Sequence, residues 1–156
     1  LIAQSGKIDQ LILNQAIDNF EIQSYDKSLD IKNFDISFAR GLSLEDGCAT
    51  VTNFTAYLIA KGIEYSNEDK NKNITYLICG GGRKNNFLIK CIKDYLSNQT
   101  NLSLEIIDNY EYDGDYIESQ AFGYIAIRSF LNLPISFPTT TGCDKPTVGG
   151  KIVGNY

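Results

Sequence analysis

The sequence contains no histidine. Histidine is the commonest general base in enzymes that work near neutral pH, and it is also the commonest protein ligand of transition metals. Its absence leaves acid–base chemistry to carboxylate, cysteine, lysine or tyrosine side chains. A CxxC pair is missing as well, because the four cysteines Cys48, Cys79, Cys91 and Cys143 stand far apart. This spacing indicates neither a zinc site nor a disulfide framework, so we expect buried free thiols.

Long apolar runs and clusters of positive charge are also missing. No segment approaches the roughly 20 apolar residues that span a bilayer, and residues 1–10 contain no signal-like segment. We therefore expect a soluble, cytoplasmic protein without a membrane partner. Leu1 is not a natural start, so a further segment is expected upstream of it. The net charge of -5 argues against a nucleic-acid partner, because such proteins neutralise phosphates with clustered Lys and Arg.

The composition is that of a globular domain that folds in water. The chain has 156 residues, of which 43% are hydrophobic and 21% are charged. Both values are close to the average of soluble proteins. A chain of this length can bury about 70% of its unfolded surface in one core. One compact domain is therefore expected.

Two helices are predicted in the first part of the chain. The first begins near Ser5 and buries a face of four residues spaced by three and four positions, namely Ile8, Leu11, Ile12 and Ala16. The second begins at Ser43, whose hydroxyl is a good N-cap, and the acidic Asp46 has a structural role in the same first turn. This helix should run to about Ala60, and Gly62 is placed to end it with a left-handed cap.

A βαβ unit is predicted in the middle of the chain. Residues 74–79 form an almost unbroken apolar run, typical of a central parallel strand with helices over both faces. Three consecutive glycines at 80–82 end this strand, and residues 87–96 then follow a helical period. A second strand over residues 102–107 completes the unit through a right-handed crossover. The sequence therefore predicts an α/β fold.

The last predicted helix begins at Asp115, interpreted as its N-cap, and continues to Leu133. Glu118 lies three residues after Asp115 and completes a capping-box pattern. Apolar residues cover most of the circumference of this helix, so we expect it to be buried. Residues 19–37 and 137–156 show no sustained period and are expected to be irregular or extended.

The glycine turn is the main candidate for a ligand site. Gly80, Gly81 and Gly82 allow a tight turn and leave the backbone open to a ligand, while the following helix points its free amides the same way. Such a turn can bind a nucleotide, but it can also be only a turn. It is not a P-loop, and Asn85 occupies the place of the last glycine in GxGxxG. Its neighbours have ordinary interpretations too, Arg83 and Lys84 as a solvated face and Asn85 as an N-cap.

The wider string around this turn, Cys79-Gly80-Gly81-Gly82-Arg83-Lys84-Asn85, resembles the adenosine motif of the sugar kinase, Hsp70 and actin superfamily. Other segments in the same order resemble one family within it, the bacterial anhydro-N-acetylmuramic acid kinases of cell-wall recycling. These segments are Lys27-Ser28 with Phe34, LEDGCAT at 44–50 with Thr55-Ala56, DGDYIESQAF at 113–122, Leu133-Pro134, TTG at 140–142 and PTVGG at 146–150. Tyr25-Asp26 and Asp30-Ile31 depart from the family pattern.

The resemblance implies one part of a two-lobed kinase that closes over ATP and a 1,6-anhydro sugar. Water attacks the anomeric carbon while the 6-oxygen takes the γ-phosphoryl group, which gives N-acetylmuramic acid 6-phosphate. Residues 1–156 would be the C-terminal, nucleotide-side lobe, a partial actin-like (ribonuclease H-like) domain with a βαβ core and covering helices. The catalytic base and the groups that hold Mg²⁺ are expected upstream of Leu1, so this chain alone should be inactive.

The resemblance also assigns residues. Gly80, Gly81, Gly82 and Asn85 would contact the nucleotide, and Glu118 would face the substrate, although it can equally be a capping-box residue. No metal ligand is expected in this chain. One edge of the sheet should be open or covered by another chain, either the missing N-terminal lobe or a second copy in a homodimer. Two alternatives stay open, a truncated or split nucleotide-binding module without turnover and a lobe of another carbohydrate kinase.

Overall fold

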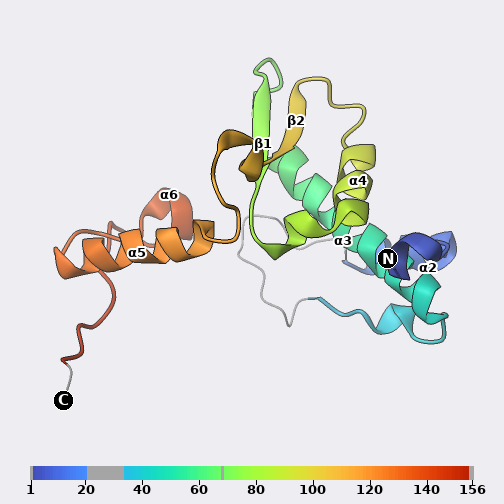
Figure 1. The fold of residues 1–156 in the computed structure, drawn as a ribbon, viewed down its shortest axis with the longest axis horizontal. Coiled ribbons are helices and arrows are strands. Elements are labelled where there is room, and N and C mark those ends of the chain that lie inside the picture. The colour runs from blue at the N-terminus through green and yellow to red at the C-terminus, as the bar shows by residue number, and fades with distance from the viewer. Residues whose placement is uncertain (1, 21–33, 68, 155–156) are drawn as a thin grey trace.

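A computed structural model describes residues 2–20, 34–67 and 69–154. The helices and strands follow one another in the order α1 (Ile2–Ser5), α2 (Gln10–Phe20), η2 (Ser37–Ala39), α3 (Leu44–Ser66), β1 (Ile74–Ile78), η3 (Gly81–Lys84), α4 (Asn86–Tyr95), β2 (Leu102–Ile106), η4 (Ile107–Tyr110), α5 (Ile117–Phe130) and α6 (Pro138–Thr141). Figure 1 shows helices α2 to α4 and the two strands as one body, with α5 and α6 to one side of it.

The predicted βαβ unit is confirmed. Strands β1 and β2 are parallel neighbours, paired from Ile74 with Leu102 to Ile78 with Ile106, and α4 forms the crossover between them. Their inward side chains pack with α3 and α4 around Ala56, Ile92 and Leu104, which are all buried. The α/β class is therefore confirmed, and the arrangement is compatible with part of an actin-like lobe.

The prediction that β1 is buried on both faces is wrong. Its side chains alternate between half-buried and exposed, and Leu77 on the outer face is 45% exposed. On that face the hydroxyls of Thr75 and Ser103 are hydrogen bonded to each other across the two strands, 2.7 Å apart. Helices α3 and α4 cover only the other face of the sheet. Within the described ranges, the outer face with Thr75 and Leu77 is left exposed. Cys79 is exposed for the same reason, whereas Cys91 is buried.

Helix α3 is the longest element and joins two core clusters. Its N-terminus is capped as predicted, because the Ser43 hydroxyl accepts a hydrogen bond from the Asp46 amide at 3.1 Å. The predicted end at Gly62 is wrong, since the helix continues to Ser66. Its last turns place Ile63 against the core beside β1, and this packing outweighs the roughly 1 kcal/mol by which glycine disfavours a helix interior.

The predicted start of the first long helix at Ser5 is also wrong. Helix α2 begins at Gln10, where the Asp9 carboxylate accepts from the Ile12 amide at 3.0 Å. The later start is caused by Gly6, which lies so close to α3 that a Cβ would overlap the Glu45 carbonyl. The buried face of α2 therefore consists of Leu13 and Ala16, whereas Ile8 and Leu11 are exposed.

The prediction that the last helix is buried is wrong as well. No residue of α5 is buried, and Phe122 and Phe130 are 64% and 69% exposed. The described residues place few contacts on α5 from any other element. Most of residues 137–154 are irregular as predicted, but Pro138–Thr141 forms a short helix. Proline is favoured at the first helical position, where its missing N–H is not needed.

Within the described ranges no helix is both long and apolar enough to cross a membrane.

Phe34, from the family-like segment, stacks on Phe20 with ring centroids 5.5 Å apart. The other residues singled out in that segment, at 25–28 and 30–31, lie outside the described residues.

Candidate functional site

The glycine turn lies at the carboxyl end of β1 and is open. Gly80 has φ 75°, in the left-handed region that favours glycine, and its amide donates to the Gly114 carbonyl at 2.9 Å. Gly81 and Gly82 begin the short helix η3. A Cβ added at any of the three would meet no atom within 4 Å. The turn thus exposes bare peptide, as the nucleotide hypothesis requires.

Asn85 joins the turn to helix α4. Its side-chain oxygen accepts from the Leu88 amide at 3.2 Å, so the interpretation of Asn85 as an N-cap is correct. The amide nitrogen of the same side chain is a chemically suitable donor for a ligand. Asn85 also borders an open hollow of about 540 Å³, whose other walls are formed by α1, residues 36–43 and the first turns of α3. That volume is in the range of small-ligand sites.

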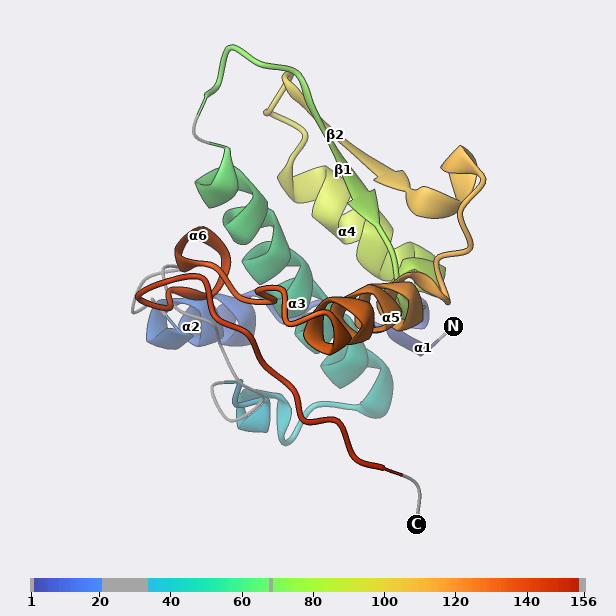
Figure 2. The same ribbon diagram turned by 90° about the vertical axis from the view of Figure 1, so that its left-hand side faces the viewer.

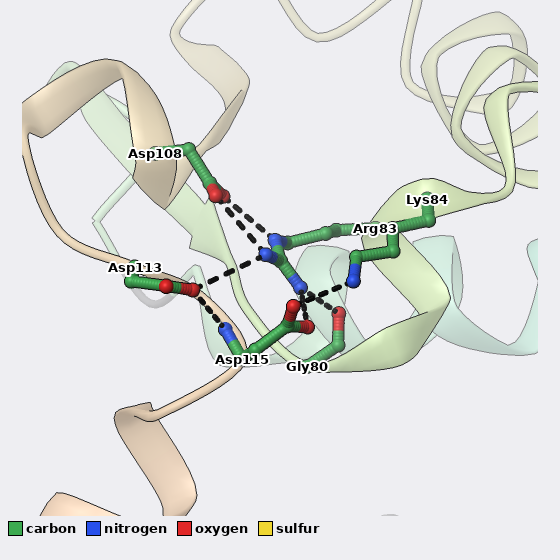
Figure 3. A network of polar contacts seen from close by, with 6 residues as sticks. All are labelled: Gly80, Arg83, Lys84, Asp108, Asp113 and Asp115. Carbon is green, nitrogen blue, oxygen red and sulfur yellow. Dashed lines mark hydrogen bonds and ion pairs between the residues drawn. The ribbon is translucent and has the colours of Figure 1, made fainter.

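Arg83 was interpreted from the sequence as part of a solvated face, and this is wrong. Its side chain is only 5% exposed and lies at the centre of the network in Figure 3. The guanidinium donates to both carboxylate oxygens of Asp108 at 2.7 and 3.0 Å. It also donates to Asp115 at 2.6 Å and to the Gly80 carbonyl at 3.0 Å. Its hydrogen bonds to the Asp108 carboxylate, and secondly to that of Asp115, raise the pKa of Arg83.

Asp115 is not the N-cap that the sequence predicted. Tyr116 occupies the cap position of α5, without a side-chain cap hydrogen bond. The Asp115 carboxylate is instead bound by Arg83 and by Lys84, the latter at 2.5 Å. Both cations lower the pKa of Asp115, to about 2, with Arg83 the larger cause. Arg83 likewise lowers the pKa of Asp108.

Arg83 and Asp108 were missed as a pair by the sequence reasoning. A usable signal was present, because Arg83 follows β1, Asp108 follows β2, and the carboxyl ends of parallel strands meet at one edge of a sheet. The network ties the glycine turn to the segment that leads into α5. Gly114 in that segment is buried, and Arg83 fills the space where its side chain would be.

Glu118 lies in the first turn of α5 and is exposed. The capping box that formed its alternative interpretation is not observed, because α5 has no side-chain cap. Glu118 follows Asp115 by three residues, so the Arg83 network holds the start of its helix beside the glycine turn.

The aspartates near the turn gather around the Arg83 guanidinium. Asp108 and Asp115 bind Arg83 directly, and an Asp113 oxygen lies 3.7 Å from it. Among the described residues no group of three or more Asp, Glu or Cys side chains is arranged to hold a metal ion.

The chain is similar in sequence to one family of known proteins over nearly its whole length. The family model for anhydro-N-acetylmuramic acid kinase matches residues 2–155. The chain belongs to this family. The resemblance inferred from the motifs is therefore confirmed.

Curated anhydro-N-acetylmuramic acid kinases are similar to the chain over nearly all its length. The protein from Pelagibacter ubique (strain HTCC1062) is 52% identical over 154 residues, or 97% of this chain. That from Zymomonas mobilis subsp. mobilis (strain ATCC 31821 / ZM4 / CP4) is 37% identical over 153 residues, and that from Caulobacter vibrioides (strain ATCC 19089 / CIP 103742 / CB 15) is 36% identical over 155. The chain spans about 40% of the length of each of these relatives.

Proposed function

We propose that this chain is the nucleotide-binding, C-terminal lobe of an anhydro-N-acetylmuramic acid kinase. Gly80, Gly81 and Gly82 contact ATP through bare peptide, and Asn85 borders the same site. The observation that carries this proposal is the open space around all three glycines, at the end of a strand and beside the N-terminus of α4. Amides at a helix N-terminus attract phosphate, which adds affinity for a nucleotide.

The proposed reaction opens the 1,6-anhydro ring of anhydro-N-acetylmuramic acid and phosphorylates O6. Water forms the new bond to C1 and gives a proton to a base, while the bond from C1 to O6 breaks. O6 takes the γ-phosphoryl group, so the products are ADP and N-acetylmuramic acid 6-phosphate. The catalytic base and the ligands of Mg²⁺ belong to the rest of the enzyme, which works in the cytoplasm in peptidoglycan recycling. In this scheme Glu118 faces the sugar from the first turn of α5.

The nucleotide site is tested by replacing Gly81 with valine. The space around Gly81 is empty and its φ is not positive, so Gly81→Val should leave the fold intact while its methyl groups obstruct the ligand. We expect the Kd for a fluorescent ATP analogue to rise at least about tenfold, equivalent to about 1.4 kcal/mol. Gly123→Val is the matched control, because Gly123 lies in α5 with equally open surroundings. An unchanged Kd for Gly81→Val would remove the turn from the site.

The part played by this chain in turnover is tested separately. Phosphorylation of the anhydro sugar is assayed with this chain alone and with a polypeptide that comprises the rest of the Pelagibacter ubique relative. Turnover in the mixture alone supports a two-part enzyme. ATP binding without turnover in either sample identifies a non-catalytic module.

A further inference from the structure

The glycine turn has little of its own to hold it in one conformation. Glycine has more backbone freedom than any other residue, and three glycines stand in a row at 80–82. A Cβ added at any of them would meet no atom within 4 Å, so close packing does not confine the turn. A ligand that binds a loose segment must first order it, and this ordering weakens binding. A nucleotide site at the turn therefore needs contacts that order the glycines beforehand.

Both polar groups of the Gly80 backbone are held by hydrogen bonds. The amide donates to the Gly114 carbonyl at 2.9 Å. The carbonyl accepts from a terminal guanidinium nitrogen of Arg83 at 3.0 Å and from the Arg83 amide at 3.3 Å. Figure 2 shows the segment that leads into α5 beside the end of β1, in agreement with Figure 1. The backbone of Gly80, with its φ of 75°, is thus fixed from two sides.

Arg83 can hold the turn because its own side chain is fixed. Its Nε and one terminal nitrogen donate to the two oxygens of Asp108, a paired geometry that sets the plane of the guanidinium. The other terminal nitrogen donates both to Asp115 and to the Gly80 carbonyl (Figure 3). The side chain is only 5% exposed, and a buried cation is stable only beside the carboxylates that compensate its charge.

These contacts require the shape of arginine as well as its charge. An ammonium group is a compact point charge, whereas the guanidinium fork reaches Asp108, Asp115 and Gly80 at once. The neighbouring Lys84 carries the same charge, but its side chain is 62% exposed and binds Asp115 from the outside of the network. A lysine at position 83 would keep the charge and lose part of the set of hydrogen bonds.

We infer that Arg83 is a positioning residue of the nucleotide site, which fixes the peptide groups of the glycine turn in the conformation that ATP contacts. It acts through the turn and does not itself touch the nucleotide. Asp108 and Asp115 act through Arg83, so the affinity for ATP depends on carboxylates 25 and 32 positions further along the chain. The inference rests on the proposed function, because it takes the glycine turn to be the nucleotide site.

The test compares Arg83→Lys with the wild-type chain. Asp108 and Asp115 are 42% and 44% exposed, so water can hydrate an oxygen that lysine leaves free, and the variant should fold. If the loosened turn adopts the binding conformation about a tenth of the time, the Kd for a fluorescent ATP analogue rises about tenfold. Without ligand, ¹⁵N relaxation should show the amides of Gly81 and Gly82 to be more mobile than in wild type.

Three further variants make the comparison specific. Lys84→Arg exchanges the same two side chains at the exposed neighbouring position and should leave Kd and amide mobility unchanged. Leu13→Ala removes a buried side chain between α2 and α3, so it lowers stability without touching the turn. Its Kd should equal that of wild type at a temperature where circular dichroism shows a folded chain. Asp108→Asn keeps one acceptor oxygen for Arg83 and should raise the Kd, which provides a second test if Arg83→Lys does not fold.

Several results would overturn the inference and leave the proposed function intact. One is a folded Arg83→Lys chain that binds the analogue as tightly as wild type, while Gly81→Val binds it more weakly. Another is an unchanged mobility of the glycine amides in Arg83→Lys. A third is an equal rise of the Kd in Leu13→Ala, which would reduce the effect to a loss of stability. A wild-type chain that does not bind the analogue, or whose binding Gly81→Val leaves unchanged, would refute the proposed function and this inference together.

Discussion

Gly114→Ala tests whether Arg83 is packed between the glycine turn and the start of α5. A Cβ at Gly114 would lie 2.7 Å from Cζ and 2.8 Å from Cδ of Arg83, far inside van der Waals contact. The backbone of Gly114 does not have a positive φ, so alanine causes no backbone strain there. Overpacking of this kind costs about 1–3 kcal/mol. For a chain of this size each kcal/mol lowers Tm by about 2–4 °C, so the expected fall is about 2–12 °C.

The matched control for this substitution is Gly123→Ala. Gly123 lies in α5 with nothing within 4 Å of a Cβ, so alanine should stabilise the helix by about 0.5–1 kcal/mol. Thermal unfolding followed by circular dichroism measures both variants. A Gly114→Ala variant as stable as wild type would refute the packing of Arg83 against Gly114.

A double-mutant cycle then identifies the cause of the loss. Arg83→Ala removes the atoms that the new Cβ would meet, so adding Gly114→Ala to it should cost almost nothing. The two substitutions should therefore be coupled by about the full overpacking penalty of 1–3 kcal/mol. Equal penalties in the wild-type and Arg83→Ala backgrounds would show that another neighbour is responsible.

Two further predictions concern the packing of Leu13 in the core and the loss of stability at acidic pH. Leu13→Ala should lower the free energy of unfolding by about 2–5 kcal/mol, because Leu13 is 1% exposed between α2 and α3. Leu11→Ala, at a side chain 69% exposed, should change it by less than about 0.5 kcal/mol, and equal losses in urea titrations would contradict the observed face of α2. The lowered pKa of Asp115, about 2, means that its stabilising contribution is complete above the unfolded pKa of about 3.9 and is lost as pH falls through 2. Asp115→Asn should therefore be less stable than wild type at pH 7 and lose less on acidification from pH 5 to pH 2, whereas parallel pH profiles would contradict the ion pairs with Arg83 and Lys84.

Local patterns in the sequence were enough to predict the central unit of the fold. The strand, glycine turn, helix and strand from Ile74 to Ile106 depend on apolar runs and turn residues within short segments. The Ser43 cap is equally local, since its bond to Asp46 spans three residues. The family motifs around Gly80 to Asn85 lie in the same part of the chain.

The features that could not be predicted depend on contacts between distant segments. Helix α2 starts late because Gly6 packs against Glu45, and α3 passes Gly62 because Ile63 packs beside β1. Arg83 binds acidic residues that lie 25 and 32 positions later, which no helical or strand period reveals. The exposure of α5 was missed for a different reason. Its apolar pattern indicates a buried helix, and within the described ranges only the tail after α5 lies against it, which leaves Phe122 and Phe130 exposed.

The nucleotide site at the glycine turn is tested most directly by a ¹H–¹⁵N NMR titration of the chain with ATP. The amide signals of Gly80, Gly81 and Gly82 should shift together along one saturation curve, and those of Asn85 and the first turn of α4 should follow. The amide of Leu13, in the core between α2 and α3, should stay in place. Saturable ATP binding that leaves all three glycine signals unmoved would contradict the proposed site.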